Sequence, residues 1–251
     1  MNETIRKSAQ ISGAEVTEAD LKLINKLSIR PLTAEEVFVF RVAMCDNEVD
    51  RDFEVFPTSA LKGLAKLYKG KTVIANHMWK SENQVARIFE TEVVPDDARQ
   101  TQNGETYAQL VARCYMLRTD TNKDLIAEIE AGIKKEVSVG CAMQSAVCSI
   151  CGMDNRKTWC QHYNGKEYDG KLCYFKLEGA RDAYELSFVA VPAQREAGII
   201  KAYGAEKPKE PPAPNPDEAR EKSKAEADVK IRLADAFLFA KKNRNTEVTE
   251  E

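Results

Sequence analysis

The sequence predicts an α+β fold with a mostly antiparallel β core, or partial barrel, and a few flanking helices. Several runs are rich in β-branched and aromatic residues, as buried strands are. The polar segment DDARQTQNGE joins two of these runs and favours a hairpin. Between other runs, apolar residues recur every three or four positions, which is typical of amphipathic helices. A chain of 251 residues can bury one such core and add a small satellite module.

Six segments have strand character. The first, residues 37–44 (VFVFRVAM), ends at a turn that begins with Asp46. Residues 84–94 and 107–117 flank the predicted hairpin loop, and antiparallel pairing is the simplest arrangement for them. The remaining three are residues 72–76 (TVIAN), 137–143 (VSVGCAM) and 185–191 (ELSFVAV). Pro192 closes the last of these because proline lacks a backbone donor.

Three helices are predicted between the strands and before the first one. Thr17 resembles the N-cap of a short leading helix with acidic residues in its first turn. Thr58 or Ser59 caps a second helix, which Gly70 stops. Asn122 begins a third helix, which also ends at a glycine.

The charge balance excludes polyanion-binding proteins as a class. Lysine and arginine number 37 against 40 acidic residues, so the net charge of -3 gives no general attraction to nucleic acid or membrane. No apolar stretch approaches the roughly 18 residues that would span a bilayer, and the N-terminus lacks the apolar core of a secretory signal. We therefore expect a protein that has no nucleic-acid or membrane partner and stays in the cytoplasm where it is made.

Composition divides the chain into four parts. Residues 1–34 form a helical lead and residues 35–202 the main domain, which contains a cysteine-rich insertion at 147–173. Residues 203–228 are proline-rich and charged, as extended linkers are, and include the start of a helix. Residues 229–251 are predicted to form an amphipathic helix and an acidic tail, which would dock on a partner or on the chain's own domain.

The cysteine-rich insertion has metal-ligand spacing. Cys148 and Cys151 form a C-x-x-C pair, and Cys160 and His162 form a C-x-H pair eight residues further on. Thiolates and imidazoles in a tetrahedral set of four are typical of structural zinc, so we predict a Zn²⁺ site here. His162 is favoured as the fourth ligand and Cys173 is the alternative. A redox-active C-x-x-C would leave Cys160 and His162 unexplained.

The other cysteines and the acidic turn are interpreted as structural. Cys45, Cys114 and Cys141 stand apart in apolar, strand-like surroundings and are predicted to be small core residues. The turn that contains Asp46 and three further acids lacks the central glycine and the terminal glutamate of a calcium loop, so it is predicted to be a solvated turn.

His77 and Ser138 are the candidate catalytic pair. His77 follows the strand at residues 72–76, and a general base held at the end of a rigid element is well placed for catalysis. Ser138 lies in EVSVGC, where Gly140 would let a substrate backbone come close. Taken alone, each residue has an ordinary structural explanation, because many histidines end strands and many serines lie beside glycines.

The order of several segments over residues 35–200 resembles the prohead (capsid-maturation) serine proteases of tailed phages. These segments are MCDNEVDRD, the F-P-x-x-A-L that opens the second helix, the strand-end Asn76-His77, the QVARI strand, AGIKKEVSVG and the closing YELSFVAVPAQREAG. The resemblance implies a herpesvirus-protease-like architecture. The insertion at 147–173 departs from the family pattern, in which this region is shorter.

The resemblance also implies the roles of three residues. His77 is similar to the family's general base, Ser138 to its nucleophile, and Glu185 to the acid that orients the histidine ring. Asp182 is the alternative acid. The implied reaction is peptide hydrolysis through an acyl-enzyme, without a catalytic metal.

The function implied is a protease that cleaves scaffold and major capsid proteins inside an assembling phage head in the host cytoplasm, with self-cleavage included. The sequence is also compatible with an oligomer. A different class of function, a non-catalytic zinc-containing assembly or scaffold-binding protein with a protease-like fold, remains open. A cysteine protease is a third hypothesis, although no histidine is suggested as a partner for Cys141.

Overall fold

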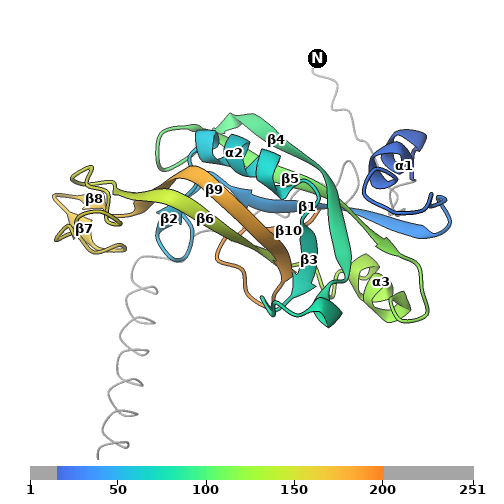
Figure 1. Ribbon diagram of the computed structural model, residues 1–251. Helices are drawn as coiled ribbons and strands as arrows, with labels where there is room; N and C mark the ends of the chain where they lie inside the picture. The colour runs from blue at the N-terminus through green and yellow to red at the C-terminus, as the bar shows by residue number, and fades with distance from the viewer. Residues whose placement is uncertain (1–15, 201–251) are drawn as a thin grey trace, which may run out of the picture. The chain divides into compact units, whose positions relative to one another are not determined.

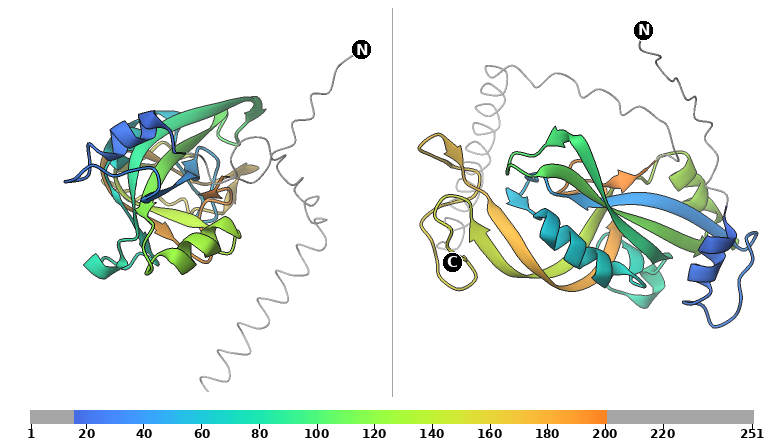
Figure 2. Two further views of the ribbon diagram at one scale, coloured as in Figure 1. Left: turned by 90° about the vertical axis from the view of Figure 1, so that its right-hand side faces the viewer. Right: turned by 90° about the horizontal axis from the view of Figure 1, so that it is seen from above.

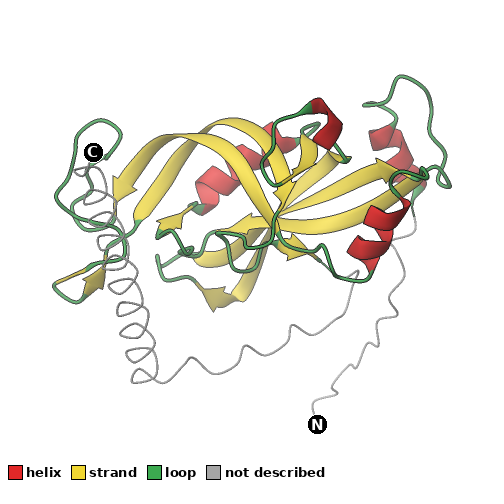
Figure 3. Cartoon of the chain, turned by 90° about the horizontal axis from the view of Figure 1, so that it is seen from below, coloured by secondary structure: helices red, strands yellow, loops and turns green. Residues whose placement is uncertain are grey.

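The computed structural model describes residues 16–200, and these form the predicted α+β fold. Figure 3 shows that strands outweigh helices over these residues and that the helices are short. The helices are α1 (Glu18–Ile24), α2 (Thr58–Tyr68), α3 (Lys123–Glu130) and the 3₁₀ turn η1 (Ser81–Asn83). The strands are β1 (Val37–Asp46), β2 (Glu54–Val55), β3 (Thr72–Ala75), β4 (Ala86–Gln100), β5 (Thr106–Leu117), β6 (Val137–Cys148), β7 (Glu167–Tyr168), β8 (Lys171–Leu172), β9 (Phe175–Phe188) and β10 (Gly198–Ile199). The predicted linker at 203–228 and the C-terminal helix and tail at 229–251 lie outside the described residues.

The main sheet is mixed. Its strands follow the order β10-β1-β5-β4-β3-β9-β2, and β6 pairs with β9 outside this path. Most neighbouring strands run antiparallel, as predicted, but β3 and β2 both run parallel to β9. Over residues 16–200 the sheet does not close into a barrel.

A long ribbon of β6 and β9 projects from the sheet. The two strands pair antiparallel from Val137 opposite Phe188 to Cys148 opposite Phe175. Figure 1 shows this ribbon extending to the small β7–β8 hairpin. Ten residues separate Ser138 from Cys148 along β6, so at about 3.3 Å per residue the two positions are roughly 30 Å apart. Any site at one end of the ribbon is therefore remote from a site at the other.

The hydrophobic core lies between α2 and the inner face of the sheet. The helix runs across the strands in the view from above (Figure 2) and buries its predicted apolar face, which includes Leu61 and Leu64. From the sheet, Val137, Leu186 and Phe188 join the same core. Because side chains alternate along a strand, the neighbouring positions on β6 and β9 face away from this core.

The first two helices are capped in different ways. The predicted N-cap at Thr17 is confirmed, and it forms a capping box with reciprocal hydrogen bonds to Asp20. The buried Asp20 carboxylate also accepts a hydrogen bond from Arg113 Nη2 on β5 at 2.6 Å. The predicted cap of α2 is wrong. Pro57 occupies the N-cap position, and the Glu105 carboxylate accepts hydrogen bonds from Thr58 N and Oγ1 at 2.8 and 2.6 Å. A carboxylate from another strand thus replaces the local cap.

Two strand boundaries also differ from prediction. β4 continues through the first half of DDARQTQNGE to Gln100, and residues 101–105 form the turn. β9 begins at Phe175, ten residues before the predicted start. β9 ends at Phe188, short of Pro192. The carbonyl oxygen of Phe188 accepts a hydrogen bond from the backbone N–H of Asn76, which lies just beyond β3.

The acidic turn is not solvated at its first residue, which corrects the sequence interpretation. Asp46 is buried, and its carboxylate accepts hydrogen bonds from Glu48 N at 2.9 Å and from Tyr107 Oη at 3.0 Å. Burial raises the pKa of Asp46 to about 6, an effect that its hydrogen bonds oppose and the nearby Glu196 carboxylate reinforces. The charged form of Asp46 therefore destabilises the fold.

This burial makes the stability of the fold depend on pH. The folded-state pKa of about 6 lies above the ordinary value of 3.8, so the folded protein binds more protons between these values and its stability falls as the pH rises from 4 to 6. The two-unit difference corresponds to about 3 kcal/mol. Between pH 4 and pH 7, the free energy of unfolding of Asp46→Asn, measured in urea, should rise by about 3 kcal/mol relative to that of wild type. Parallel stability curves for the two proteins would contradict the assignment.

Candidate active site and metal centre

His77 follows β3 at a strained turn. Asn76 and His77 both have positive φ angles, 54° and 52°, a region that side-chain-bearing residues seldom occupy. The turn is held by Met78 N, which donates to Ala75 O at 3.1 Å, and by His77 N, which donates to Ser187 Oγ at 2.8 Å. Strain of this kind is maintained by surrounding contacts and is concentrated at functional sites.

The imidazole of His77 pairs with Glu185. Nδ1 of the ring lies 2.8 Å from Glu185 Oε1, and Glu185 is only 3% exposed. When the carboxylate is ionised, the ring proton is on Nδ1, which donates a hydrogen bond to Oε1. Nε2 is then unprotonated and can accept a hydrogen bond. The His77 side chain is half-exposed, so it is accessible to a substrate.

Glu185, and not Asp182, is brought to His77. Asp182 Oδ1 instead lies 3.5 Å from Lys71 Nζ, and its side chain is half-exposed. The second oxygen of Glu185, Oε2, is buried and receives no hydrogen bond from the described residues. Burying a carboxylate that leaves one oxygen without a hydrogen bond destabilises the fold. Its hydrogen bond with His77 offsets part of this free energy.

Ser138 lies on β6, across β9 from β3, and within residues 16–200 no hydrogen bond joins its side chain to His77. It is directly opposite Ser187 in the β6–β9 register, and Gly140 is directly opposite Glu185. Residues opposite each other in an antiparallel pair share a face of the sheet with Cβ atoms about 5 Å apart. Ser138 therefore shares the outer face with Ser187 and Glu185, and it is half-buried.

Gly140 has a different role from the predicted one. A Cβ atom at this position would overlap Glu185 Oε1 and lie 2.9 Å from Glu185 Cδ. The glycine thus makes room for the carboxylate of Glu185, whereas the sequence interpretation assigned that room to a substrate backbone. Its carbonyl oxygen accepts a hydrogen bond from the buried Tyr68 hydroxyl at 2.9 Å, which fixes the strand at this point.

Ser187 is a further residue of the candidate site that was not predicted from the sequence. Ser187 braces the backbone of His77 and stands opposite Ser138, so it connects β3, β6 and β9. A signal for it was present, because Glu185 and Ser187 are two positions apart on one strand and so must face the same side. Tyr68, which comes from α2, had no such signal.

The four predicted metal ligands come together at the far end of the ribbon. The ligand atoms of Cys148, Cys151, Cys160 and His162 all lie within 4.8 Å of one another and form a candidate metal site. Cys148 and Cys160 are buried, and Nδ1 of His162 is buried without a hydrogen-bond partner. Ligands at zinc–sulfur distances of about 2.3 Å in a tetrahedron lie about 3.8 Å apart, so small inward movements would complete the site.

Cys173 is a fifth donor at the edge of this set. Its sulfur lies 3.9 Å from the sulfur of Cys148, and the residue is fully buried. Burial and the neighbouring Cys148 thiol raise the pKa of Cys173 to about 12. For Cys148, burial also raises the pKa, but hydrogen bonds from the backbone of Cys151 and Ile150 outweigh it and bring the pKa below its ordinary value. Cys173 thus lies at the edge of the candidate metal site, close to the sulfur of Cys148.

The three isolated cysteines largely follow prediction. Cys45 and Cys114 are buried in the core, and burial holds the pKa of both thiols well above its ordinary value. Cys141 is half-buried, and burial raises its pKa to about 11. A thiol that stays protonated is a poor nucleophile, which argues against a cysteine protease.

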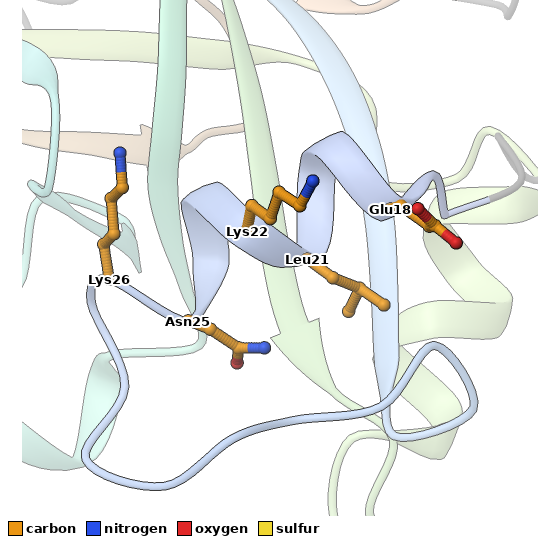
Figure 4. Close-up of a pocket in the computed structure, with 5 residues that line it drawn as sticks. All are labelled: Glu18, Leu21, Lys22, Asn25 and Lys26. Atoms are coloured by element: carbon orange, nitrogen blue, oxygen red, sulfur yellow. The ribbon is translucent and has the colours of Figure 1, made fainter.

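A surface hollow beside α1 is distinct from both sites. It is lined by five residues of the helix and its C-terminal end, as Figure 4 shows: Glu18, Leu21, Lys22, Asn25 and Lys26. None of these belongs to the catalytic candidates or to the metal ligands.

Comparison of the chain with protein-family models, with curated proteins and with solved structures finds no match. Its function must therefore be inferred from its own residues. Over residues 16–200, no helix combines the length and the apolar character needed to cross a membrane.

Proposed function

We propose that the protein is a serine endopeptidase in which Ser138 is the nucleophile, His77 the general base and Glu185 the orienting acid. The observation that carries this proposal is the 2.8 Å contact between His77 Nδ1 and the buried Glu185 carboxylate. It orients a histidine beside the strand position of Ser138, and the three side chains come from segments far apart in the sequence. A serine nucleophile, a histidine base and an acid that orients the histidine are the parts of the serine-hydrolase arrangement.

The reaction uses each group in turn. His77 Nε2 takes the Ser138 hydroxyl proton as Oγ attacks the peptide carbonyl, and the imidazolium then gives that proton to the leaving amine. Glu185 stabilises the imidazolium, because its negative charge is buried 2.8 Å away. Water then gives a proton to His77 and attacks the acyl-enzyme, which releases the acid product and restores Ser138.

We propose a structural Zn²⁺ held by Cys148, Cys151, Cys160 and His162. Three thiolates and an imidazole are a ligand set that zinc prefers, and a closed set of four leaves no position for a reacting water. The site also lies roughly 30 Å along the ribbon from Ser138, too far for the ion to contact the reacting atoms. Its contribution is to fold the loop at 147–173.

The proposed biological role is processing of scaffold and capsid proteins in an assembling phage head, with self-cleavage included. It is supported by the ordered sequence resemblance to prohead proteases and by the arrangement of His77, Glu185 and Ser138. The competing function, a non-catalytic assembly protein, does not account for a strained turn that directs a histidine to a buried carboxylate.

The test is covalent labelling of the purified full chain with a fluorophosphonate, a reagent that reacts with activated serines. Wild type should be labelled at Ser138, as located by mass spectrometry, and should cleave denatured casein. Ser138→Ala should lose labelling and lose at least about 10⁴-fold in cleavage, and His77→Ala should lose a similar factor. Ser145→Ala, on the same strand, is the matched control and should behave as wild type.

Two outcomes would reject the proposal. If wild type is neither labelled nor proteolytic, the non-catalytic alternative is favoured. If Ser138→Ala is labelled and cleaves casein like wild type, another residue is the nucleophile. Co-expression with the coat and scaffold proteins of the same virus, wild type against Ser138→Ala, then tests the proposed substrates.

A further inference from the structure

An aromatic pair lies next to the His77–Glu185 contact. The rings of Trp79 and Tyr184 have centroids 5.4 Å apart and are tilted by 53°. Trp79 follows His77 by two residues, and Tyr184 directly precedes Glu185. One ring thus comes from the loop after the proposed base, and the other from the strand that carries the proposed acid.

A β-bulge places Tyr184 at this point. Gly140 is opposite Glu185 and the next residue, Cys141, is opposite Ala183, so Tyr184 has no partner on β6. A bulge of this kind bends the strand and redirects the side chain of the extra residue. Tyr184 is 42% exposed although the residues on both sides of it, Ala183 and Glu185, are buried.

The loop that carries Trp79 is fixed by hydrogen bonds. Lys80 N donates to Met78 O at 2.8 Å, and Asn83 Nδ2 donates to the same oxygen at 3.1 Å. The 3₁₀ turn η1 follows immediately. Trp79 is nevertheless 70% exposed, and Met78 is also exposed. The fold therefore holds large apolar side chains in water in a defined position.

We propose that Trp79 and Tyr184 form a subsite that binds a large apolar or aromatic side chain of the peptide substrate close to the cleaved bond. This proposal rests on the proposed protease function. The contact between the two rings leaves most of the Trp79 surface in water, so packing of the fold does not explain its placement. A substrate side chain seated on the rings would bury this surface and position its backbone at His77.

The chemistry of the pair defines its ligand. Aromatic rings bind apolar and aromatic side chains by burial and by edge or offset stacking. Recognition of one such side chain is worth roughly 10- to 100-fold in kcat/KM. A small ester without a side chain would gain nothing from this subsite.

The test compares cleavage sites in denatured casein with hydrolysis of p-nitrophenyl acetate. For wild type, mass spectrometry should find Phe, Tyr, Trp, Leu or Met enriched within three residues of the cleaved bonds. Trp79→Ala and Tyr184→Ala should each cut these sites about 10- to 100-fold more slowly and hydrolyse the ester at the wild-type rate. Trp79→Phe should retain the preference.

Trp159→Ala is the matched control, since Trp159 is also 70% exposed but belongs to the metal-binding loop. It should leave both activities unchanged. The subsite is rejected if wild type shows no enrichment, or if Trp79→Ala keeps the wild-type sites and rates. If wild type hydrolyses neither casein nor the ester, the proposed protease function is rejected, and the proposed subsite is rejected with it.

Discussion

Glu185→Gln is expected to lower kcat for peptide cleavage by about 10⁴-fold while leaving the fold at least as stable as wild type. The carboxylate accepts a hydrogen bond from His77 Nδ1–H, whereas a glutamine amide can also donate to this nitrogen, which favours the ring tautomer with Nε2 protonated. A protonated Nε2 cannot take the Ser138 proton. Comparable removal of the orienting charge in serine proteases costs about this factor.

Glu185→Gln should lower kcat but raise the stability of the fold, because the buried carboxylate lacks a hydrogen bond at Oε2 within residues 16–200. Glu185 is buried and its Oε2 has no hydrogen-bond partner among the described residues, so a neutral side chain of the same size should stabilise the fold by about 1 kcal/mol. Urea unfolding and casein cleavage measure the two quantities. Glu178→Gln, an exposed change on the same strand, is the control. If the Glu185→Gln variant kept more than about a tenth of the wild-type kcat, Glu185 would have no part in the mechanism.

Removal of the metal is expected to unfold the loop at 147–173 and to leave the rest of the sheet folded. The loop has few buried apolar residues besides its cysteines, so metal–ligand bonds at the proposed site would supply most of its folding free energy. Wild type should carry about one zinc per chain, and Cys160→Ser should carry none. Amide hydrogen exchange within the loop should then accelerate by at least about 100-fold.

The fourth ligand can be decided in the same experiment. His162 has a buried Nδ1 without a partner, so His162→Ala should lose the metal, whereas Cys173→Ser should retain it. Cys141→Ser, outside the cluster, is the control for metal content. The reverse result would assign Cys173 as the ligand. Zinc-free wild-type protein, purified without chelator, would refute the metal site.

Much of the fold was predictable because its patterns are local. The apolar run of β1, the face of α2 and the capping box at Thr17 all follow from neighbouring residues. The misses have tertiary causes. Glu105 replaces the local cap of α2, and the parallel neighbours of β9 involve strands far apart in the sequence. The burial of Asp46 depends on Tyr107, 61 residues away.

The sequence suggested the members of the candidate sites but not the contacts that hold them. The metal ligands follow from spacing, since C-x-x-C and C-x-H confine four donors to one short loop. His77 and Glu185 were identified only through the order of segments over residues 35–200. The supporting residues were hidden, because the bracing by Ser187 and the bulge at Tyr184 exist only once β6 and β9 have paired.

The missing side chain at Gly140 restricts how this site can evolve. Any other residue at position 140 would place its Cβ atom where the Glu185 carboxylate lies. Even Gly140→Ala would therefore displace the Glu185 carboxylate from its position next to His77. Position 140 can therefore accept a larger residue only if position 185 also changes. A chain of this architecture that carries a larger residue opposite its acid has lost the means to orient a histidine there, whatever serine and histidine it has kept.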